Sequence, residues 1–185
     1  NVKPKPGRNP FDIYLRELYG DYLPSPRSRW CTRKLKIEPF EKYVGEGYVY
    51  SYIGIRADED RDGYTAKKPP KFSDKPNIIP VYPFRDDDLR LADIKRLLED
   101  SGLGMPDYYK WRSRSGCYFC FYQQIGEWQR LKKNHPEMFE AAKKYENESK
   151  GFTWNEGRTL DEVAALPEQP LPIIDETGGC AICHL

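Results

Sequence analysis

The chain has 185 residues, of which 38% are hydrophobic and 32% charged, and its formal net charge is +1. This length suits one domain of ordinary size, and the hydrophobic content excludes an intrinsically disordered chain. Because the charge is nearly balanced, no global field attracts the protein to nucleic acid or to a membrane, although local basic clusters could still do so. The sequence has no run of ~18 apolar residues and no apolar signal region at its amino end, so we expect a cytoplasmic protein without a membrane partner.

The first third of the chain alternates helical and extended patterns. Apolar residues recur at helical spacing in "PFDIYLRELYG", residues 10–20, which predicts a short helix that stops at Gly20. A second helical pattern covers residues 32–44, and Pro39 is expected to cut or kink any helix there. The β-branched and aromatic run from Tyr48 to Ile55 predicts a strand that is buried on both faces and central in its sheet.

The remainder of the chain is mainly helical in pattern. "NIIPVYPF", residues 77–84, predicts a second short strand, and residues 85–102 predict a helix with Asp at its start and Gly102 after its end. Two further helices are expected near Ile125–Lys133 and Pro136–Glu146.

The five cysteines form one single residue, Cys31, and two C-x-x-C pairs, Cys117 with Cys120 and Cys180 with Cys183. An odd number of cysteines in an intracellular context favours metal or redox chemistry over a disulfide framework. Two C-x-x-C pairs suit a tetrahedral zinc site that holds loops together, whereas Cys31 with three of the other four suits a [4Fe–4S] cluster. The spacing leaves both kinds of site open.

Arginines lie beside the cysteines and after the predicted strand. Arg29 is two residues from Cys31, and a guanidinium group near a thiol lowers its pKa and also binds phosphate or sulfate. Arg56 directly follows the buried strand run and Arg61 comes five residues later, a layout that presents guanidinium groups to a phosphate at a strand's carboxyl end. These residues predict an anion site, with a structural ion pair to Asp58 as the alternative.

Four segments together resemble the phosphoadenosine-phosphosulfate reductase family, including its relatives in DNA phosphorothioation and in phage and defence loci. The segments, in the family's order, are "RWCTRKLKIEPF", "YIGIRADEDR", "IIPVYPFRDDDLRLADIKRLLEDSGL" and "RSRSGCYFC". Each is modest alone, but the four in this order are fairly specific, and the similarity runs from about Arg27 to Glu140.

The resemblance implies an α/β fold with an open sheet of the adenine-nucleotide α-hydrolase type and a helical, cysteine-bearing carboxyl-terminal region. It also implies ATP or an adenylated nucleotide as substrate and, in the cluster-bearing branch, a [4Fe–4S] centre. Lys34, Arg56 and Arg61 match positions near the anionic groups of that substrate. The residues that match the cluster ligands are Cys31, Cys117 and Cys120, with Cys183 or Cys180 as the fourth.

The chain departs from the family in two places. Trp30 precedes Cys31 where cluster-bearing sulfonucleotide reductases have a second cysteine, which argues against simple sulfonucleotide reduction. The family's phosphate-binding Ser-Gly-Gly loop is also absent, so an upstream segment or a partner chain supplies it, or the chain no longer binds nucleotide. We expect an amino-terminal arm at 1–26, a reductase-like α/β region at 27–150 and a C-x-x-C tail at 151–185.

These features predict an iron–sulfur-dependent sulfur-transfer or sulfonucleotide-processing enzyme, or a subunit of one, that acts with an adenine nucleotide. Cys183 is expected to complete the cluster, while Cys180 carries persulfide sulfur to an acceptor that could be DNA, tRNA or a small metabolite. The alternative is a non-catalytic, zinc-stapled module that contacts a partner protein or nucleic acid.

Overall fold

A computed structural model describes residues 7–59, 73–113, 115–148 and 150–170. By their packing these residues divide into two compact units, which are described separately. Unit 1 contains residues 7–38 and 117–170, and unit 2 contains residues 39–116 apart from the undescribed stretches. In the described part of the chain, no helix is long and apolar enough to cross a bilayer.

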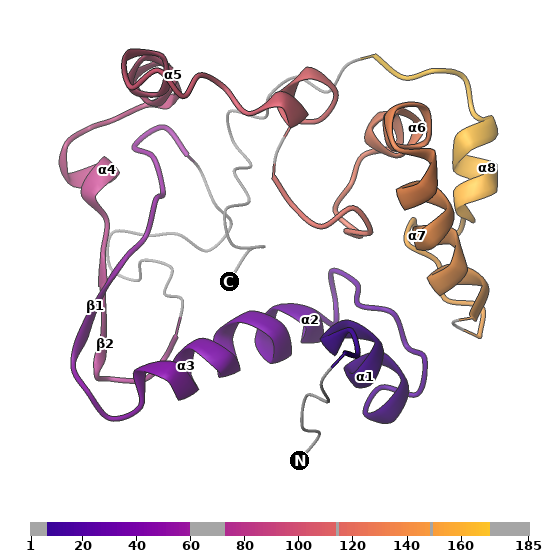
Figure 1. Cartoon of the computed structure of the whole chain (residues 1–185), viewed down its shortest axis with the longest axis horizontal. Coiled ribbons are helices and arrows are strands. Elements are labelled where there is room, and N and C mark those ends of the chain that lie inside the picture. Colours follow the sequence, from indigo (N-terminus) through magenta and orange to yellow (C-terminus); the bar gives the residue numbers. More distant parts are fainter. Residues whose placement is uncertain (1–6, 60–72, 114, 149, 171–185) are drawn as a thin grey trace. The chain divides into compact units, whose positions relative to one another are not determined.

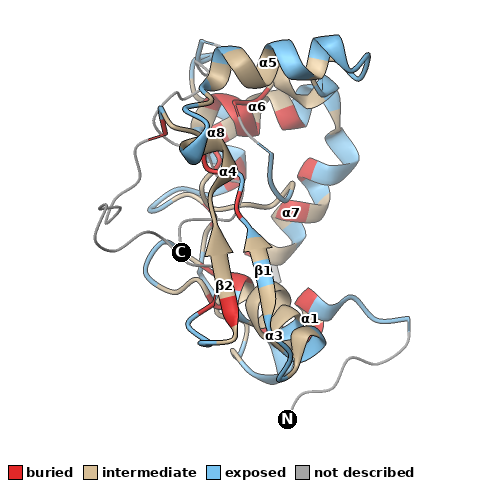
Figure 2. Ribbon diagram, turned by 90° about the vertical axis from the view of Figure 1, so that its left-hand side faces the viewer, coloured by how far each residue is buried: buried red, intermediate tan, exposed pale blue. Residues whose placement is uncertain are grey.

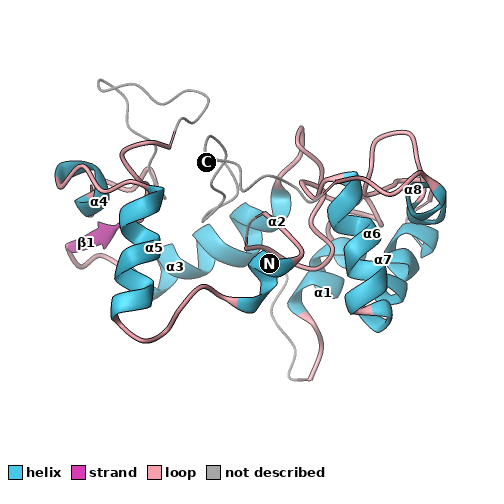
Figure 3. Cartoon of the chain, turned by 90° about the horizontal axis from the view of Figure 1, so that it is seen from above, coloured by secondary structure: helices cyan, strands magenta, loops and turns pink. Residues whose placement is uncertain are grey.

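Unit 1 is built from helices, which Figure 3 draws in cyan. Its elements are α1 (Pro10–Glu17), α2 (Trp30–Thr32), the π-helical segment η1 (Arg33–Ile37), α6 (Ile125–Asn134), α7 (Pro136–Glu148) and α8 (Leu160–Ala165). The helices predicted near residues 10–20, 125–133 and 136–146 are therefore confirmed.

Local sequence explains where the helices of unit 1 begin. The side chain of Asn9 accepts a hydrogen bond from the backbone N–H of Phe11 at 3.0 Å, and Pro10 occupies the first turn of α1. In α8, Thr159 and Glu162 form a capping box, in which each side chain accepts from the other's backbone N–H. Such caps satisfy N–H groups that have no partner inside the helix.

The core of unit 1 is aromatic at its centre. The ring of Phe11 stacks on Trp30 with centroids 5.1 Å apart and meets Phe119 at 4.6 Å and Tyr145 at 5.2 Å. Trp154 lies 5.5 Å from Phe119, so residues from four distant stretches of the chain share one cluster of rings. Offset and edge-on ring pairs of this kind add to the stabilisation from burial alone.

The chain is helical from Trp30 to Val44, through Pro39. The prediction that Pro39 cuts or kinks this helix misses how the chain accommodates the ring. Proline lacks an N–H and clashes with the carbonyl four residues earlier, here that of Leu35. The π-helical segment η1, Arg33–Ile37, lies at that carbonyl and ends two residues before Pro39. Its wider turn leaves room for the ring, and α3 (Glu38–Val44) continues from it.

Unit 2 is a mixed α/β unit, and its strands lie side by side in Figure 2. Besides α3 its elements are β1 (Val49–Tyr52), β2 (Ile78–Val81), α4 (Pro83–Asp86), α5 (Leu91–Asp100) and the 3₁₀ helix η2 (Asp107–Lys110). Figure 1 shows β1 and β2 running together from the α3 end of the unit toward α4. The strands pair in parallel, with Tyr50 opposite Ile79 and Tyr52 opposite Val81. The two predicted strands are confirmed, and the helix predicted at 85–102 is confirmed over Leu91–Asp100, because Arg85 and Asp86 end the separate helix α4.

The prediction that the first strand is central and buried on both faces is wrong for the described residues. The described sheet has only two strands. Tyr50 and Tyr52 are 69% and 73% exposed, whereas Val49 and Ser51, which alternate with them in β1, are partly buried, and Ile53 and Ile55 just beyond the strand are buried. Side chains of a strand alternate between two faces, so one face of β1 is covered and the other is open. Continuous hydrophobicity in the sequence did not reveal this difference.

Candidate functional site

Unit 1 contains three of the predicted ligands, Cys31, Cys117 and Cys120, and none of them is in a disulfide. Cys31 is the second residue of α2, two residues before the first residue of the π-helical segment, and is partly buried. Cys117 is exposed and Cys120 partly buried. A partly accessible thiol on a short helical turn is in a suitable position to bind a metal or a cluster.

The Cys117–Cys120 segment is a closed turn. The backbone N–H of Cys120 donates to the carbonyl of Cys117 at 3.2 Å. Gln123, which is only 4% exposed, holds this turn from outside: its backbone N–H donates to the carbonyl of Cys120 at 3.0 Å, and its side-chain amide donates to the carbonyl of Tyr118 at 2.7 Å. The turn therefore has a defined shape, which a pair of metal ligands requires.

The two cysteine segments meet on one side chain, Phe11. Trp30 immediately precedes Cys31, Phe119 lies between Cys117 and Cys120, and both rings pack on the ring of Phe11. Trp30 is fixed further by its indole N–H, which donates to the carbonyl of Tyr22 at 3.1 Å. The structure thus brings together two cysteine segments that lie more than eighty residues apart in the sequence.

Two buried polar atoms beside these cysteines have no hydrogen-bond partner. They are the hydroxyl oxygen of Thr32, next to Cys31, and the amide oxygen of Gln123, which follows the Cys117–Cys120 turn. Buried polar atoms are normally satisfied, so each of these two atoms still has the capacity for one more hydrogen bond. Sequence reasoning missed both, because neither Thr nor Gln is a usual signal for a metal or cluster site.

The described residues hold only part of the predicted ligand set. Among them, no group of three or more His, Cys, Asp or Glu side chains is placed to hold a metal ion. Cys180, the predicted persulfide carrier, and Cys183, the predicted fourth ligand, lie outside the described residues. The structure therefore shows the two segments that bear Cys31, Cys117 and Cys120 packed on one ring, without a closed coordination shell.

Basic residues near Cys31 already have partners within unit 1. The ammonium group of Lys34 contacts the carboxylate of Glu38 at 2.6 Å, and this hydrogen bond raises the pKa of Lys34. The guanidinium of Arg33 lies 3.4 Å from the same carboxylate. Arg29 is the N-cap residue of α2, and its carbonyl accepts from the backbone N–H of Thr32. Glu38 thus offsets part of the positive charge that the sequence places beside the cysteine.

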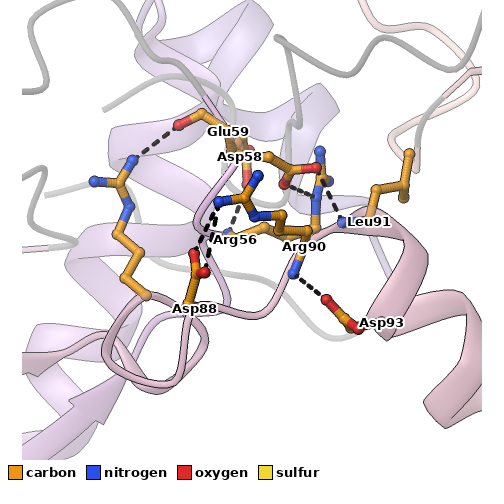
Figure 4. Close-up of polar contacts among 8 residues, drawn as sticks. Arg56, Asp58, Glu59, Asp88, Arg90, Leu91 and Asp93 are labelled. Carbon is orange, nitrogen blue, oxygen red and sulfur yellow. Dashed lines mark hydrogen bonds and ion pairs between the residues drawn. The ribbon is translucent and has the colours of Figure 1, made fainter.

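Arg56, the other described candidate for anion binding, belongs to a polar network in unit 2 (Figure 4). Its side chain, 13% exposed, donates to the carboxylate of Asp58 at 2.9 Å, and its backbone N–H donates to Glu59 at 3.1 Å. The second oxygen of Asp58 accepts from the backbone N–H of Leu91, the first residue of α5, at 3.0 Å. Arg61 lies outside the described residues.

The Asp58 carboxylate connects the end of the first strand segment to the start of α5. Burial alone would raise the pKa of Asp58, but the N–H of Leu91 and the Arg56 guanidinium outweigh it, so the pKa is lowered. The neighbouring Tyr109 has its pKa raised to about 12, first by burial and then by its hydrogen bond with Tyr108. These contacts support the structural ion pair that sequence analysis kept as the alternative for Arg56.

Comparison with known proteins gives two archaeal relatives, both from Methanocaldococcus jannaschii. Uncharacterized protein MJ0066 is 28% identical over 131 residues, which are 68% of this chain and 26% of that protein. Uncharacterized protein MJ0973 is 29% identical over 147 residues, which are 75% of this chain and 33% of that protein. The chain thus spans between a quarter and a third of the length of these curated relatives. No family model matches the chain, and no solved structure matches it.

Proposed function

We propose that this chain is part of an iron–sulfur-dependent enzyme, similar to the phosphoadenosine-phosphosulfate reductases, that transfers sulfur or processes a sulfonucleotide with the help of an adenine nucleotide. Cys31, Cys117, Cys120 and Cys183 would bind a [4Fe–4S] cluster, and Cys180 would carry sulfur as a persulfide. The acceptor would be DNA, tRNA or a small molecule. Arg29, Lys34, Arg56 and Arg61 would lie toward the anionic groups of the nucleotide.

One observation carries this proposal: the rings of Trp30 and Phe119 both pack on the ring of Phe11. Because each ring is adjacent to cysteine in the sequence, this contact draws Cys31 toward the Cys117–Cys120 turn. A zinc site made from the two C-x-x-C pairs would not require Cys31 to be there. A four-sulfur cluster site would, since it needs one more thiolate than a single C-x-x-C turn and one tail cysteine provide.

The residues around the three cysteines fit an iron–sulfur group. The donor set would be three thiols on two segments that both pack on Phe11, and the buried oxygens of Thr32 and Gln123, close to these cysteines in the sequence, have no partner. The Thr32 hydroxyl is able to donate a hydrogen bond to a sulfur atom, and such bonds tune a cluster's potential. Bound at these cysteines, a [4Fe–4S] cluster would supply electron transfer or a Lewis-acidic iron, and Cys31, Cys117 and Cys120 would hold it.

The fold implied by the resemblance, an open sheet of the adenine-nucleotide α-hydrolase type, requires more strands than β1 and β2. The open tyrosine face of β1 supports this part of the proposal, because parallel strands are almost always covered on both faces. A segment or partner chain with the phosphate-binding loop would extend the sheet and cover that face. The relatives from Methanocaldococcus jannaschii are long enough to contain such a segment.

The alternative remains a zinc-stapled module that binds a partner protein or nucleic acid and has no catalytic role. The pairing of basic residues favours this reading, since Lys34 is held by Glu38 and Arg56 by Asp58. Side chains that are already paired must break those contacts before they bind a nucleotide phosphate. An enzyme that retained its substrate site would leave them more open.

Iron, zinc and acid-labile sulfide analysis of protein purified without oxygen tests the proposal. We expect about four irons and four sulfides per chain, with visible absorbance from thiolate-to-iron charge transfer. Replacement of Cys31, Cys117 or Cys120 with Ser should remove most of both iron and absorbance. Cys180→Ser is the matched control: it removes a cysteine from the same tail as Cys183 but should leave the iron content unchanged.

One zinc per chain without sulfide would reject the cluster and support the structural module. Full iron content in the Cys31→Ser, Cys117→Ser and Cys120→Ser variants would reject these ligands. If Cys180→Ser loses iron and Cys183→Ser retains it, the two tail cysteines exchange their proposed roles, and the remaining ligand set stands.

A further inference from the structure

Unit 1 contains a pocket that the proposed function does not use. Its volume is about 280 Å³, and it lies between the loop that leads into α2 and the loop that leads into α8. Aromatic residues form much of its lining: Tyr22, Phe121, Phe152 and Trp154. Ligand sites typically combine apolar walls with a few polar groups, and this pocket is lined by aromatic rings together with polar residues such as Ser25, Arg27 and Glu156.

The two loops that form the pocket have the same local structure. In each, a tight turn is closed by an isolated antiparallel bridge, between Ser25 and Ser28 in one loop and between Asn155 and Arg158 in the other. In each, a helix begins two residues after the turn, at Trp30 and at Leu160. The sequences of the loops do not show this equivalence, so sequence analysis detected no repeat.

Aromatic rings occupy equivalent positions at the start of both loops. Tyr22 and Phe152 each lie three residues before the first bridge residue, and their rings meet edge-on with centroids 4.4 Å apart. Phe152 remains 37% exposed, whereas Trp154 is 2% exposed and donates its indole N–H to the carbonyl of Ala142 at 2.9 Å. The pocket lining therefore includes one partly exposed ring, that of Phe152, and one buried ring, that of Trp154, which is held by a hydrogen bond.

The second loop is held in place from within the core. Glu146, which is 6% exposed, accepts hydrogen bonds from the backbone N–H groups of Trp154 at 3.0 Å and Leu160 at 2.7 Å. Its two oxygens thus fix both ends of the turn that lines the pocket. A pocket preorganised in this way loses little conformational entropy when a ligand binds.

The two charged side chains among the residues that line the pocket form only a weak ion pair with each other. Arg27 and Glu156, one from each turn, lie 4.0 Å apart with side chains 89% and 93% exposed. An ion pair this exposed contributes little to stability, so Arg27 is able to exchange Glu156 for a phosphate at small cost. Aromatic walls with a guanidinium group at the rim match a planar heteroaromatic base that is linked to a phosphate.

We propose that this pocket binds a nucleobase by stacking, with Arg27 directed to the adjoining phosphate. The pocket adjoins the candidate cysteine site, because Phe121, which lines it, directly follows Cys120. A base in the pocket would therefore place its nucleotide or strand near the Cys117–Cys120 turn. That this base belongs to the sulfur acceptor rests on the proposed function, whereas binding of the base itself does not.

The test measures binding of two probes, AMP and a fluorescein-labelled single-stranded oligodeoxyadenylate, to the whole chain. We expect Phe152→Ala to weaken binding by about 5- to 100-fold, since stacking on one aromatic side chain contributes roughly that much per base. Phe152→Trp should restore it, because the ring is retained. Tyr43→Ala is the matched control: Tyr43 is 90% exposed, lies outside the pocket lining and should leave binding unchanged.

The two probes distinguish the source of the base. Binding of AMP that competes with the oligonucleotide would indicate a free nucleotide, and binding of the oligonucleotide alone would indicate a strand. The proposal is overturned if neither probe binds at millimolar concentration, or if Phe152→Ala binds both probes as the unchanged protein does.

Failure of this inference is separable from failure of the proposed function. Phe152→Ala should retain the iron and sulfide of the unchanged protein. If the chain holds zinc but binds the base through Phe152, the pocket inference stands and the proposed enzymatic function is rejected. An iron-bearing chain with no Phe152-dependent binding would reject the pocket and leave the cluster proposal standing.

Discussion

The two units differ in how they bury apolar side chains. Of the fifteen buried aliphatic and aromatic side chains among the described residues, twelve are in unit 1 and three in unit 2. Large exposed hydrophobic residues show the reverse: unit 2 has Tyr43, Tyr48, Tyr50, Tyr52, Leu97 and Leu103. Unit 1 has a core of its own, whereas unit 2 presents surfaces that suit burial against more protein.

Secondary structure does not explain this difference. The helix α5 has an apolar stripe that the sequence predicts to face a core, yet none of its residues is buried. The same holds for the tyrosines of β1, which has good strand-forming residues but an open face. A repeating apolar pattern therefore indicates which face is suited to burial, and only tertiary packing shows whether that face is covered.

The largest expected effect is the loss of a core ring in unit 1. Trp128 is 0% exposed, and its indole N–H has no hydrogen-bond partner, so truncation removes packing without breaking a hydrogen bond. We expect Trp128→Ala to lower the free energy of unfolding by about 3–5 kcal/mol. Urea denaturation followed by circular dichroism measures this, with Tyr43→Ala as an exposed aromatic control. A loss below about 1 kcal/mol would contradict a tightly packed unit 1.

A second, smaller effect concerns the carboxylate that fixes the pocket loop. Glu146→Ala leaves the buried N–H groups of Trp154 and Leu160 without an acceptor. Two such groups cost about 2–6 kcal/mol, but removing Glu146 also relieves the cost of burying its carboxylate, so we expect a net loss of about 2–4 kcal/mol, with faster amide exchange at both residues. Glu146→Gln keeps one acceptor oxygen and should lose less. Unchanged exchange at Trp154 and Leu160 in the Ala variant would show that another group holds the loop.

Stability should depend on pH in opposite ways through the two units, because the pKa of Glu146 in unit 1 is raised and the pKa of Asp58 in unit 2 is lowered. Burial raises the pKa of Glu146 above 4.5, although its carboxylate accepts hydrogen bonds from two backbone N–H groups. The part of the free energy of unfolding that depends on protonation of Glu146 is therefore fully present below pH 4.5 and is lost as the pH rises through the folded-state pKa. The pKa of Asp58 is lowered, so the part of the free energy of unfolding that depends on ionised Asp58 is fully present above pH 3.8 and is lost as the pH falls through the folded-state pKa.

Unfolding free energies measured from about pH 3 to 7 for the unchanged chain, Glu146→Gln and Asp58→Asn would test these signs. The first variant should lose the decline on the alkaline side of pH 4.5, and the second the decline on the acid side of pH 3.8. Asp58→Asn should cost only about 1 kcal/mol, because Asp58 is partly exposed and still offers an acceptor to Leu91 after replacement. Identical pH profiles for the three proteins would contradict both assignments.

Sequence reasoning located most elements but not the features that shape the sites. The helices at α1, α5, α6 and α7 follow from periodicity and from their capping residues, which are local signals. The Thr159–Glu162 capping box at α8 is an equally local signal, so the start of this helix was also predictable from the sequence. The π-helical turn before Pro39 could not be predicted, because it depends on how the whole helix adjusts to the ring.

The residues of the candidate sites likewise divide into those that the sequence makes conspicuous and those whose roles only tertiary contacts reveal. The cysteines and Arg56 are conspicuous in the sequence, but Phe11, Gln123 and Glu146 are ordinary residues whose roles come from tertiary contacts. Pairing of Arg56 with Asp58 was foreseeable from their spacing, whereas the covering of one face of β1 and the equivalence of the two pocket loops were not. Long-range packing is the information that a single sequence does not contain.

The smallest expected effect tests directly whether the sheet of unit 2 has an exposed face. Replacing both Tyr50 and Tyr52 with Thr keeps good strand formers and removes two rings that are 69% and 73% exposed. If the face is open in this chain, the double variant should change the free energy of unfolding by no more than about 1 kcal/mol, far less than Trp128→Ala. Sedimentation should also show less self-association, because the apolar face of β1 is removed. A cost above about 3 kcal/mol would mean that the tyrosines are already buried in solution, and unit 2 would then have a covered sheet without any further segment.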